Sequence, residues 1–259
     1  MTVDRTTQPT SQPTTQSPIQ PAIQPAILDW IARIGAAAAA DVAARFELSP
    51  AQARARLQAA QRAGTLEAVR LLHGQAALHV ATPAGLRAAG LAELRPCRVS
   101  PAGFAHLREV ARTAVALERA FPELAVVGER ELRRWESDSA RPIATADVGR
   151  GPDGLPARHR PDLVLWPAPL VGQPGARPVA VIEVELTVKA PVRLATIVRG
   201  WARSRLVAGV VYYATPAAAR ALARAIAGES AGERVVVAAL EAAGEAAGLR
   251  VACSIPSAP

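Results

Sequence analysis

Two glutamates and an aspartate adjoin apolar runs in the second half of the sequence. Glu183 and Glu185 lie at the end of the run 179–185, Val-Ala-Val-Ile-Glu-Val-Glu. If this run is a strand, its side chains alternate between two faces, so both carboxylates project to the same side. Asp162 precedes a second apolar run, 163–166, and the turn-rich stretch between the runs is expected to fold the two strands together. Asp162 would then lie beside the two glutamates.

Carboxylate oxygens in this number suit Mg²⁺ or Mn²⁺. Mg²⁺ binds one or two protein carboxylates together with water and phosphate oxygens. A phosphodiester substrate fits that demand, because the metal activates a water and neutralises charge on the phosphate. Lys189, the one lysine of the chain, is placed to hold a phosphate oxygen or to assist proton transfer. We therefore predict four catalytic residues: Asp162, Glu183, Glu185 and Lys189. The alternative is that the acids form surface salt bridges with neighbouring arginines such as Arg158, Arg160 and Arg193.

Composition favours a polyanionic partner. The 259 residues include thirty basic and twenty-two acidic ones, for a formal net charge of +8. A basic balance of this size is typical of nucleic-acid binding, so double-stranded DNA is the expected partner. No apolar run reaches the roughly 20 residues of a spanning helix, and two cysteines far apart in the sequence have no zinc or redox spacing. We expect a cytoplasmic protein that does not bind a membrane.

The sequence divides into three parts. Residues 1–25 repeat Gln-Pro among Thr and Ser, and such a tail has too few apolar residues to fold, so we expect it to be disordered or extended. Residues 26–99 predict three helices and a β-hairpin, which is the order of a winged helix-turn-helix. Residues 100–259 alternate helices and strands around a long loop at 137–160, which predicts an α/β domain.

The third predicted helix carries the expected DNA-reading side chains. Ser49 is a good N-cap, Pro50 suits the first helical position and Gln52 completes a capping box. Small and apolar residues form an inward stripe, which leaves the polar side chains outward. The predicted DNA-contacting residues of this helix are Gln52, Arg54, Arg56 and Gln58. The alternative is a winged helix used only for protein contacts, because residues 26–99 have a net charge of just +4.

The order of motifs resembles a known superfamily. A helix, three strands, a helix and a strand, with Pro-Asp162 and Glu183-Val-Glu185, resemble the PD-(D/E)XK nucleases. With the winged helix and the segments 128–133, 159–162 and 182–189, the chain looks like bacterial replication-relaxation proteins of mobile elements. The resemblance implies that Asp162, Glu183 and the carbonyl of Val184 bind the metal.

The resemblance also exposes a departure. Glu185 occupies the position where most members of the superfamily have lysine. Lys189 is expected to supply the missing charge from the next helix, and Glu129 or Glu131 to add an upstream acid unless they pair with Arg133 or Arg134. His159 and Arg160 adjoin Asp162 and are expected to contact DNA, although a solvated loop histidine is the alternative for His159.

The sequence leaves three functions open. The first is a Mg²⁺-dependent nuclease-like protein of a plasmid or mobile element, which nicks DNA for replication or mobilisation. The second is a non-catalytic regulator of replication or transcription, whose degenerate nuclease domain serves DNA binding or homodimerisation. A third is an adaptor that binds a protein partner without contacting DNA.

Overall fold

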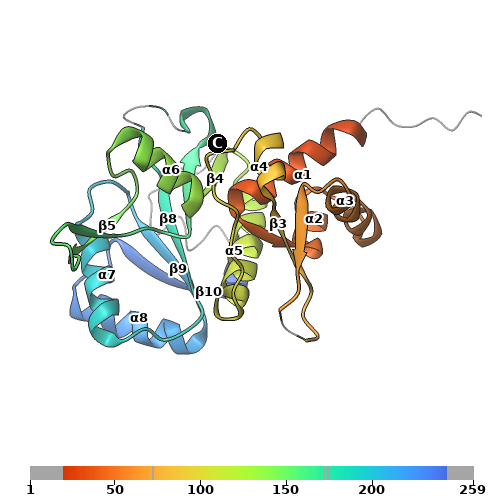
Figure 1. The fold of residues 1–259 in the computed structure, drawn as a ribbon. Coiled ribbons are helices and arrows are strands. Elements are labelled where there is room, and N and C mark those ends of the chain that lie inside the picture. Colours follow the sequence, from red (N-terminus) through yellow and green to blue (C-terminus); the bar gives the residue numbers. More distant parts are fainter. Residues whose placement is uncertain (1–19, 72, 172, 174–175, 244–259) are drawn as a thin grey trace, which may run out of the picture.

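Two groups of elements follow one another along the chain in the computed structural model, which describes residues 20–71, 73–171, 173 and 176–243 (Figure 1). The first group is mainly helical with a small antiparallel sheet. The second is built on a five-stranded sheet with helices on both faces. The protein is therefore of mixed α/β class, as the sequence predicts.

The first group holds four helices and three short strands. They are α1 (Gln20–Ile34), β1 (Ala36–Ala38), α2 (Ala39–Arg45), α3 (Pro50–Arg62), β2 (Leu66–Val69), β3 (Leu78–Ala81) and α4 (Pro83–Ala88). The strands pair in the antiparallel order β1-β3-β2. The predicted capping box is present at α3, where Ser49 accepts from the backbone N–H of Gln52 and Gln52 accepts from that of Ser49. The predicted inward stripe, Ala53, Leu57 and Ala60, is buried.

The second group alternates strands and helices. They are α5 (Pro101–Ala120), β4 (Leu124–Gly128), α6 (Glu129–Ser139), β5 (Ala146–Arg150), β6 (Pro156–His159), β7 (Leu163–Pro167), the 3-10 turn η1 (Ala168–Leu170), β8 (Ala180–Glu185), α7 (Pro191–Arg203), β9 (Val210–Ala214), α8 (Pro216–Gly228), β10 (Val235–Ala239) and the 3-10 turn η2 (Leu240–Ala242). The central sheet has the order β10-β9-β8-β7-β4. Strands β4, β7 and β8 form an antiparallel meander, whereas β8, β9 and β10 are parallel.

Alternate residues of β8 enter different cores. Ile182 and Val184 pack with α5 on one face, and Val181 packs with α7 and α8 on the other. This is the alternation that the sequence predicts for a strand ending in Glu183 and Glu185. The strand is buried along its whole length, so its two carboxylates enter the fold rather than solvent.

Helix α5 belongs to both groups. Ala111 and Val115 pack with the helices of the first group, whereas Ala114 and Leu117 pack against the five-stranded sheet. Figure 1 shows α5 between the two sheets. The helix at the predicted domain boundary therefore joins the two cores.

The structure differs from the sequence analysis, or adds to it, in four places. Residues 20–25 of the predicted tail begin α1, and residues 1–19 lie outside the described residues. The sequence predicts a short helix over residues 36–46, but residues 36–38 form β1. The charged segment 129–139 is helix α6. The predicted long loop 137–160 contains a β-hairpin, β5–β6, with an irregular register between Asp147 and Arg150.

Candidate functional site

Asp162 and Glu183 meet at one end of the β7–β8 ladder. Asp162 immediately precedes β7, and the antiparallel register pairs Leu163 with Ile182, so Asp162 lies next to Glu183 across the strands. The Oδ2 atom of Asp162 accepts a hydrogen bond from the backbone N–H of Val184 at 2.8 Å. The fold therefore brings together the two acids that the sequence placed on separate strands.

The Glu183 side chain is buried and has two polar partners. Only 5% of the residue is exposed. Its Oε1 lies 2.7 Å from Nε2 of His159 and accepts from Nε1 of Trp201 at 3.1 Å. The His159 ring also packs edge-on against the Trp201 indole, with ring centroids 5.9 Å apart. His159 is thus held between β8 and α7, and the alternative of a solvated loop histidine is wrong.

Asp162 has a histidine partner of its own. Nε2 of His106, on α5, lies 2.9 Å from Oδ1 of Asp162. Both oxygens of Asp162 therefore have partners, one from α5 and one from the backbone of β8. Sequence reasoning missed His106, since it lies on a helix 56 positions upstream and has no ligand-like spacing to any acid.

Lys189 approaches the acidic cluster around Asp162 and Glu183 from a loop. Residues 186–190 are neither helix nor strand, so the expectation that Lys189 acts from the next helix is wrong. Its ammonium group contacts the carboxylate of Glu185, which is itself 5% exposed. Burial lowers the pKa of Lys189, while the charges of Glu183 and Asp162 act to raise it. One cation thus lies in the field of three carboxylates.

The histidines are electrostatically matched to the acids. The hydrogen bond to Asp162 raises the pKa of His106. Burial acts against the charged form of His159, but the charge and hydrogen bond of Glu183 outweigh it, so the pKa of His159 is also raised. Burial raises the pKa of Glu183, although His159 opposes that shift. The arrangement can store protons at two carboxylate–histidine pairs.

Tyr212 lies opposite Glu183 on β9 and is buried. Its burial, and then the charges of Glu183 and Asp162, raise its pKa well above the ordinary tyrosine value. The phenol therefore stays protonated, and Tyr212 is a core residue rather than an ionised nucleophile.

The carboxylate oxygens of Asp162 and Glu183 are ligands of the kind that a hard cation prefers, but they are already engaged in hydrogen bonds. Two carboxylates are the number that Mg²⁺ takes from a protein when water and phosphate supply the rest. In the part of the chain that is described, no three or more His, Cys, Asp or Glu side chains are grouped to hold a metal ion. Val184 meets Asp162 through its N–H. A cation between Asp162 and Glu183 would have to replace the contacts of His106 and His159.

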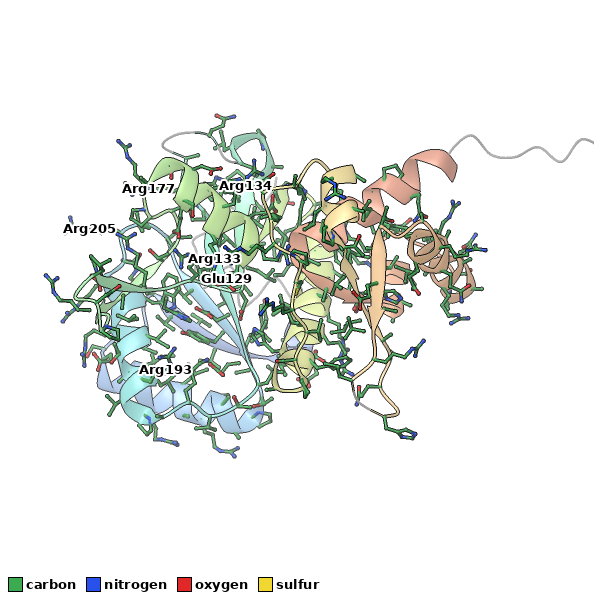
Figure 2. All side chains as sticks on the ribbon, in the orientation of Figure 1. Glu129, Arg133, Arg134, Arg177, Arg193 and Arg205 are labelled. Carbon is green, nitrogen blue, oxygen red and sulfur yellow. The ribbon has the colours of Figure 1, made fainter. Side chains whose placement is uncertain are left out.

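Two other predicted site residues are held in ion pairs. Nε of Arg160 donates to Oε2 of the buried Glu136 at 2.7 Å, so Arg160 supports α6. Glu129 pairs with Arg133 one turn along α6, in agreement with the alternative left open by the sequence, and both residues are labelled in Figure 2. The backbone N–H of Glu129 nevertheless donates to the carbonyl of Asp162 at 3.0 Å, which places the start of α6 at the cluster.

The predicted DNA-reading helix presents most of its polar residues to solvent. Arg54 and Gln58 are exposed on α3, and Arg56 is half-buried. Gln52 is exposed too, but its side-chain oxygen is used in the capping box. The carbonyl of Arg56 accepts from the side chain of Gln24 on α1 at 3.1 Å, which fixes α3 against the first helix.

No helix among the described residues combines the length and the apolarity that crossing a membrane requires. Comparisons of the chain with protein-family models, with curated proteins and with solved structures found no match.

Proposed function

We propose that the chain is a DNA-binding protein of a plasmid or mobile element that hydrolyses a DNA phosphodiester at the cluster around Asp162 and Glu183. The observation that carries the proposal is the meeting of these two acids across β7 and β8, with a lysine at the same place. The order of α5, the β4-β7-β8 meander, α7 and β9 is compatible with the PD-(D/E)XK arrangement.

The first group of elements is proposed to position DNA as a winged helix. In this reading α3 enters the major groove, where Arg54, Arg56 and Gln58 reach base edges, and the β2–β3 hairpin is the wing. The net charge of +8 supports attraction to the phosphate backbone.

The chain's own residues supply binding and proton transfer at the site. Asp162 and Glu183 would hold Mg²⁺ or Mn²⁺, which when bound activates water and stabilises charge on the phosphate. Lys189, already facing carboxylates, is placed to bind a phosphate oxygen once substrate enters. His106 and His159 pair with the two acids, and their release from Asp162 and Glu183 lets either ring move a proton at the scissile phosphate.

A nicking assay tests the proposal. Supercoiled plasmid is incubated with Mg²⁺ or Mn²⁺ and wild type, Asp162→Asn or Glu183→Gln, with Glu241→Gln as a matched control at an exposed acid. The amides keep a hydrogen-bond acceptor for the Val184 N–H and the Trp201 indole, so the fold is preserved. We expect both site variants to lose more than about 100-fold in rate, the upper end for residues that only support metal ligands. Equal nicking by all four proteins would contradict hydrolysis at this cluster.

A second function is favoured by two observations. Both oxygens of Asp162 have partners within the protein, and Glu185 stands where the superfamily pattern has lysine. These facts suit a regulator that binds DNA with a catalytically silent second domain. Calorimetric titration with Mn²⁺ separates the two, since binding that is lost in Glu183→Gln supports the enzyme. DNA binding without any Mn²⁺ binding supports the regulator.

A further inference from the structure

A pocket of about 580 Å³ lies between α6, the segment after it, and the far end of β7. Its aromatic wall is formed by Trp135 and Trp166, whose rings meet edge to face with centroids 6.0 Å apart. Ile143 and Leu206 add aliphatic surface. The volume and the mainly apolar wall are typical of sites for small organic ligands.

The pocket contains a buried donor. Trp166 is only 2% exposed, and its indole Nε1 has no hydrogen-bond partner among the described residues. A buried N–H group without an acceptor is costly, so native proteins rarely keep one without a reason. An acceptor on a ligand in the pocket would satisfy this donor.

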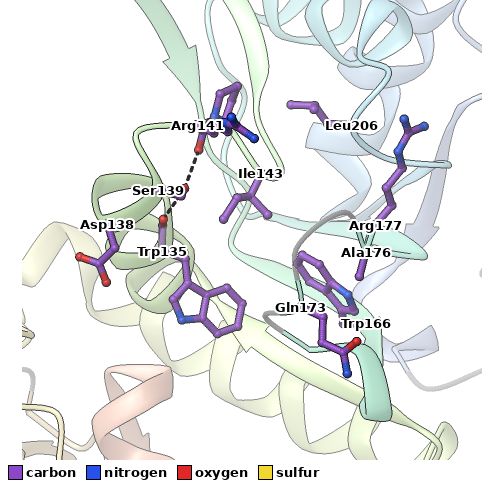
Figure 3. A pocket seen from close by; sticks show the side chains of 11 residues that line it. Trp135, Asp138, Ser139, Arg141, Ile143, Trp166, Gln173, Ala176, Arg177 and Leu206 are labelled. Atoms are coloured by element: carbon purple, nitrogen blue, oxygen red, sulfur yellow. Dashed lines mark hydrogen bonds between the residues drawn. The ribbon is translucent and has the colours of Figure 1, made fainter.

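The pocket is also positively charged at one end. In the view of Figure 3 the two indoles lie at one end, and the guanidinium groups of Arg141 and Arg177 lie at the other, with Ile143 between them. Asp138, the acidic residue among those that line the pocket, already pairs with Arg134 at 3.5 Å. Both pocket arginines are exposed, so they are available to an anion that enters from solvent.

We propose that this pocket binds the base and phosphate of a single nucleotide. A base can stack on the half-buried Trp135 indole and turn a ring acceptor toward the Trp166 N–H, and stacking of a base on an aromatic side chain is largely independent of base identity. The phosphate meets Arg141 and Arg177, since guanidinium groups bind phosphate oxygens in pairs.

The position of the pocket connects it to the acidic cluster. Trp166 lies four residues along the β7 segment from Asp162, which corresponds to roughly 13 Å at the usual rise of a strand. The base and phosphate that occupy the pocket can come from two sources. One is a free nucleotide, and the other is a nucleotide of a single strand that leads into the acidic cluster. The second source rests on the proposed function, whereas the first does not.

Calorimetric titration of the whole chain with dAMP tests the inference. The variants are Trp166→Phe, which keeps a ring and removes the donor, and the double variant Arg141→Gln with Arg177→Gln. The control is a double variant of two exposed arginines on α8, Arg220→Gln with Arg224→Gln. We expect the pocket double variant to weaken dAMP binding about 10-fold or more and Trp166→Phe to weaken it about 3- to 10-fold, while the control binds as wild type does.

The inference is overturned if dAMP binds more weakly than about 1 mM, if adenosine binds as tightly as dAMP, or if the pocket double variant binds as wild type does. The arginine variant changes only exposed side chains, so it keeps the test valid if Trp166→Phe does not fold. Competition by a six-nucleotide single strand assigns the nucleotide to DNA, and its absence assigns the pocket to free nucleotide. If dAMP binds but plasmid is not nicked, the nucleotide pocket is supported and the proposed nuclease function is contradicted. If plasmid is nicked but dAMP does not bind, the nuclease function is supported and the nucleotide pocket is contradicted.

Discussion

At the scale of single residues, the two carboxylate–histidine pairs differ in their contact with solvent. The side chains of His106 and Asp162 are 41% and 18% exposed, whereas those of His159 and Glu183 are 20% and 6% exposed. His106 is thus the more accessible of the two histidines. It can leave Asp162 at lower cost than His159 can leave Glu183, because less of its surface must be returned to water.

The His106 pair predicts a pH-dependent contribution to stability. The pKa of His106 is raised in the folded state by its bond to Asp162, so the stabilisation is fully present below the unfolded value of about 6.5. It is lost as the pH rises through the higher folded pKa. We expect wild type to exceed His106→Gln in unfolding free energy by up to about 1 kcal/mol near pH 6, because the exposed side chain is screened by solvent.

Urea unfolding of both proteins at about pH 6 and about pH 8.5 measures this difference. The gap between wild type and variant should shrink at the higher pH. His73→Gln provides the control, since His73 is an exposed histidine in the β2–β3 connection. A gap that stays constant or widens with pH would show that His106 is not charged in its pair with Asp162.

The positions of the two acids were predictable from the sequence, whereas the pairing of each acid with a histidine was not. Asp162 and Glu183 adjoin apolar runs, and the period of a strand fixes where their side chains go. His106 reaches Asp162 only because α5 packs across the sheet, and that packing depends on the whole fold. His159 is the last residue of β6, four positions before β7 begins, and the mostly exposed strands of this hairpin have little apolar pattern. A contact made by tertiary packing leaves no spacing in the sequence.

At the scale of elements, local signals decided which segments were predictable. Helices α3, α4 and α5 begin with Ser-Pro or Thr-Pro, and the serine or threonine caps each helix with its side chain. Helix α6 follows Gly128 and has no side-chain cap, so its charged sequence gave no start signal. Strand β1 is three alanines, which favour a helix in isolation but pair here with β3. Tertiary pairing overrides propensity at such positions.

The contact of α7 with the β5–β6 hairpin depends on Gly200. A Cβ atom at this position would lie 2.4 Å from the carbonyl oxygen of Asp147 and 3.0 Å from the Cβ of Ala146. Alanine favours a helix over glycine by about 1 kcal/mol, but overpacking typically costs about 1–3 kcal/mol. Because a backbone carbonyl cannot retreat as a flexible side chain can, we expect Gly200→Ala to destabilise the protein by about 1–2 kcal/mol.

Gly228→Ala is the matched control, because a Cβ at the end of α8 would meet nothing within 4 Å. Chemical unfolding should show Gly228→Ala to be neutral or slightly stabilising. Trp201 follows Gly200 and donates to Glu183, so Gly200→Ala should also weaken any activity of the cluster. Equal stability of the two variants would mean that α7 moves away from the hairpin without loss.

At the scale of the whole molecule, the two groups of elements are joined by more than a linker. Helix α5 contributes to both cores, and His106 extends from it to Asp162. Arg33 on α1 pairs with Glu131 on α6, whose side chain is only 6% exposed. The helix proposed to read DNA and the acidic cluster are therefore parts of one packed body, so DNA held by α3 has a defined position relative to the cluster.

DNA binding by the whole chain should depend steeply on salt, and α3 should account for part of that dependence. Each phosphate neutralised by an arginine contributes about 0.9 to the slope of log affinity against log salt concentration. Arg54 is exposed on α3, so Arg54→Ala should lower the slope by about 0.9 if it binds phosphate. If it reads a base instead, the loss should be about 1–3 kcal/mol on the preferred sequence and smaller on others.

Fluorescence anisotropy with a labelled duplex at several salt concentrations separates these outcomes. Arg224→Ala removes the same charge from an exposed position on α8, so it controls for the net charge of the protein. A loss confined to Arg54→Ala places the duplex on α3, because a general effect of net charge would appear equally in both variants. Identical affinity and slope in Arg54→Ala and wild type would move the DNA-binding surface away from this helix, and salt-independent or absent binding would favour a protein partner for the whole molecule.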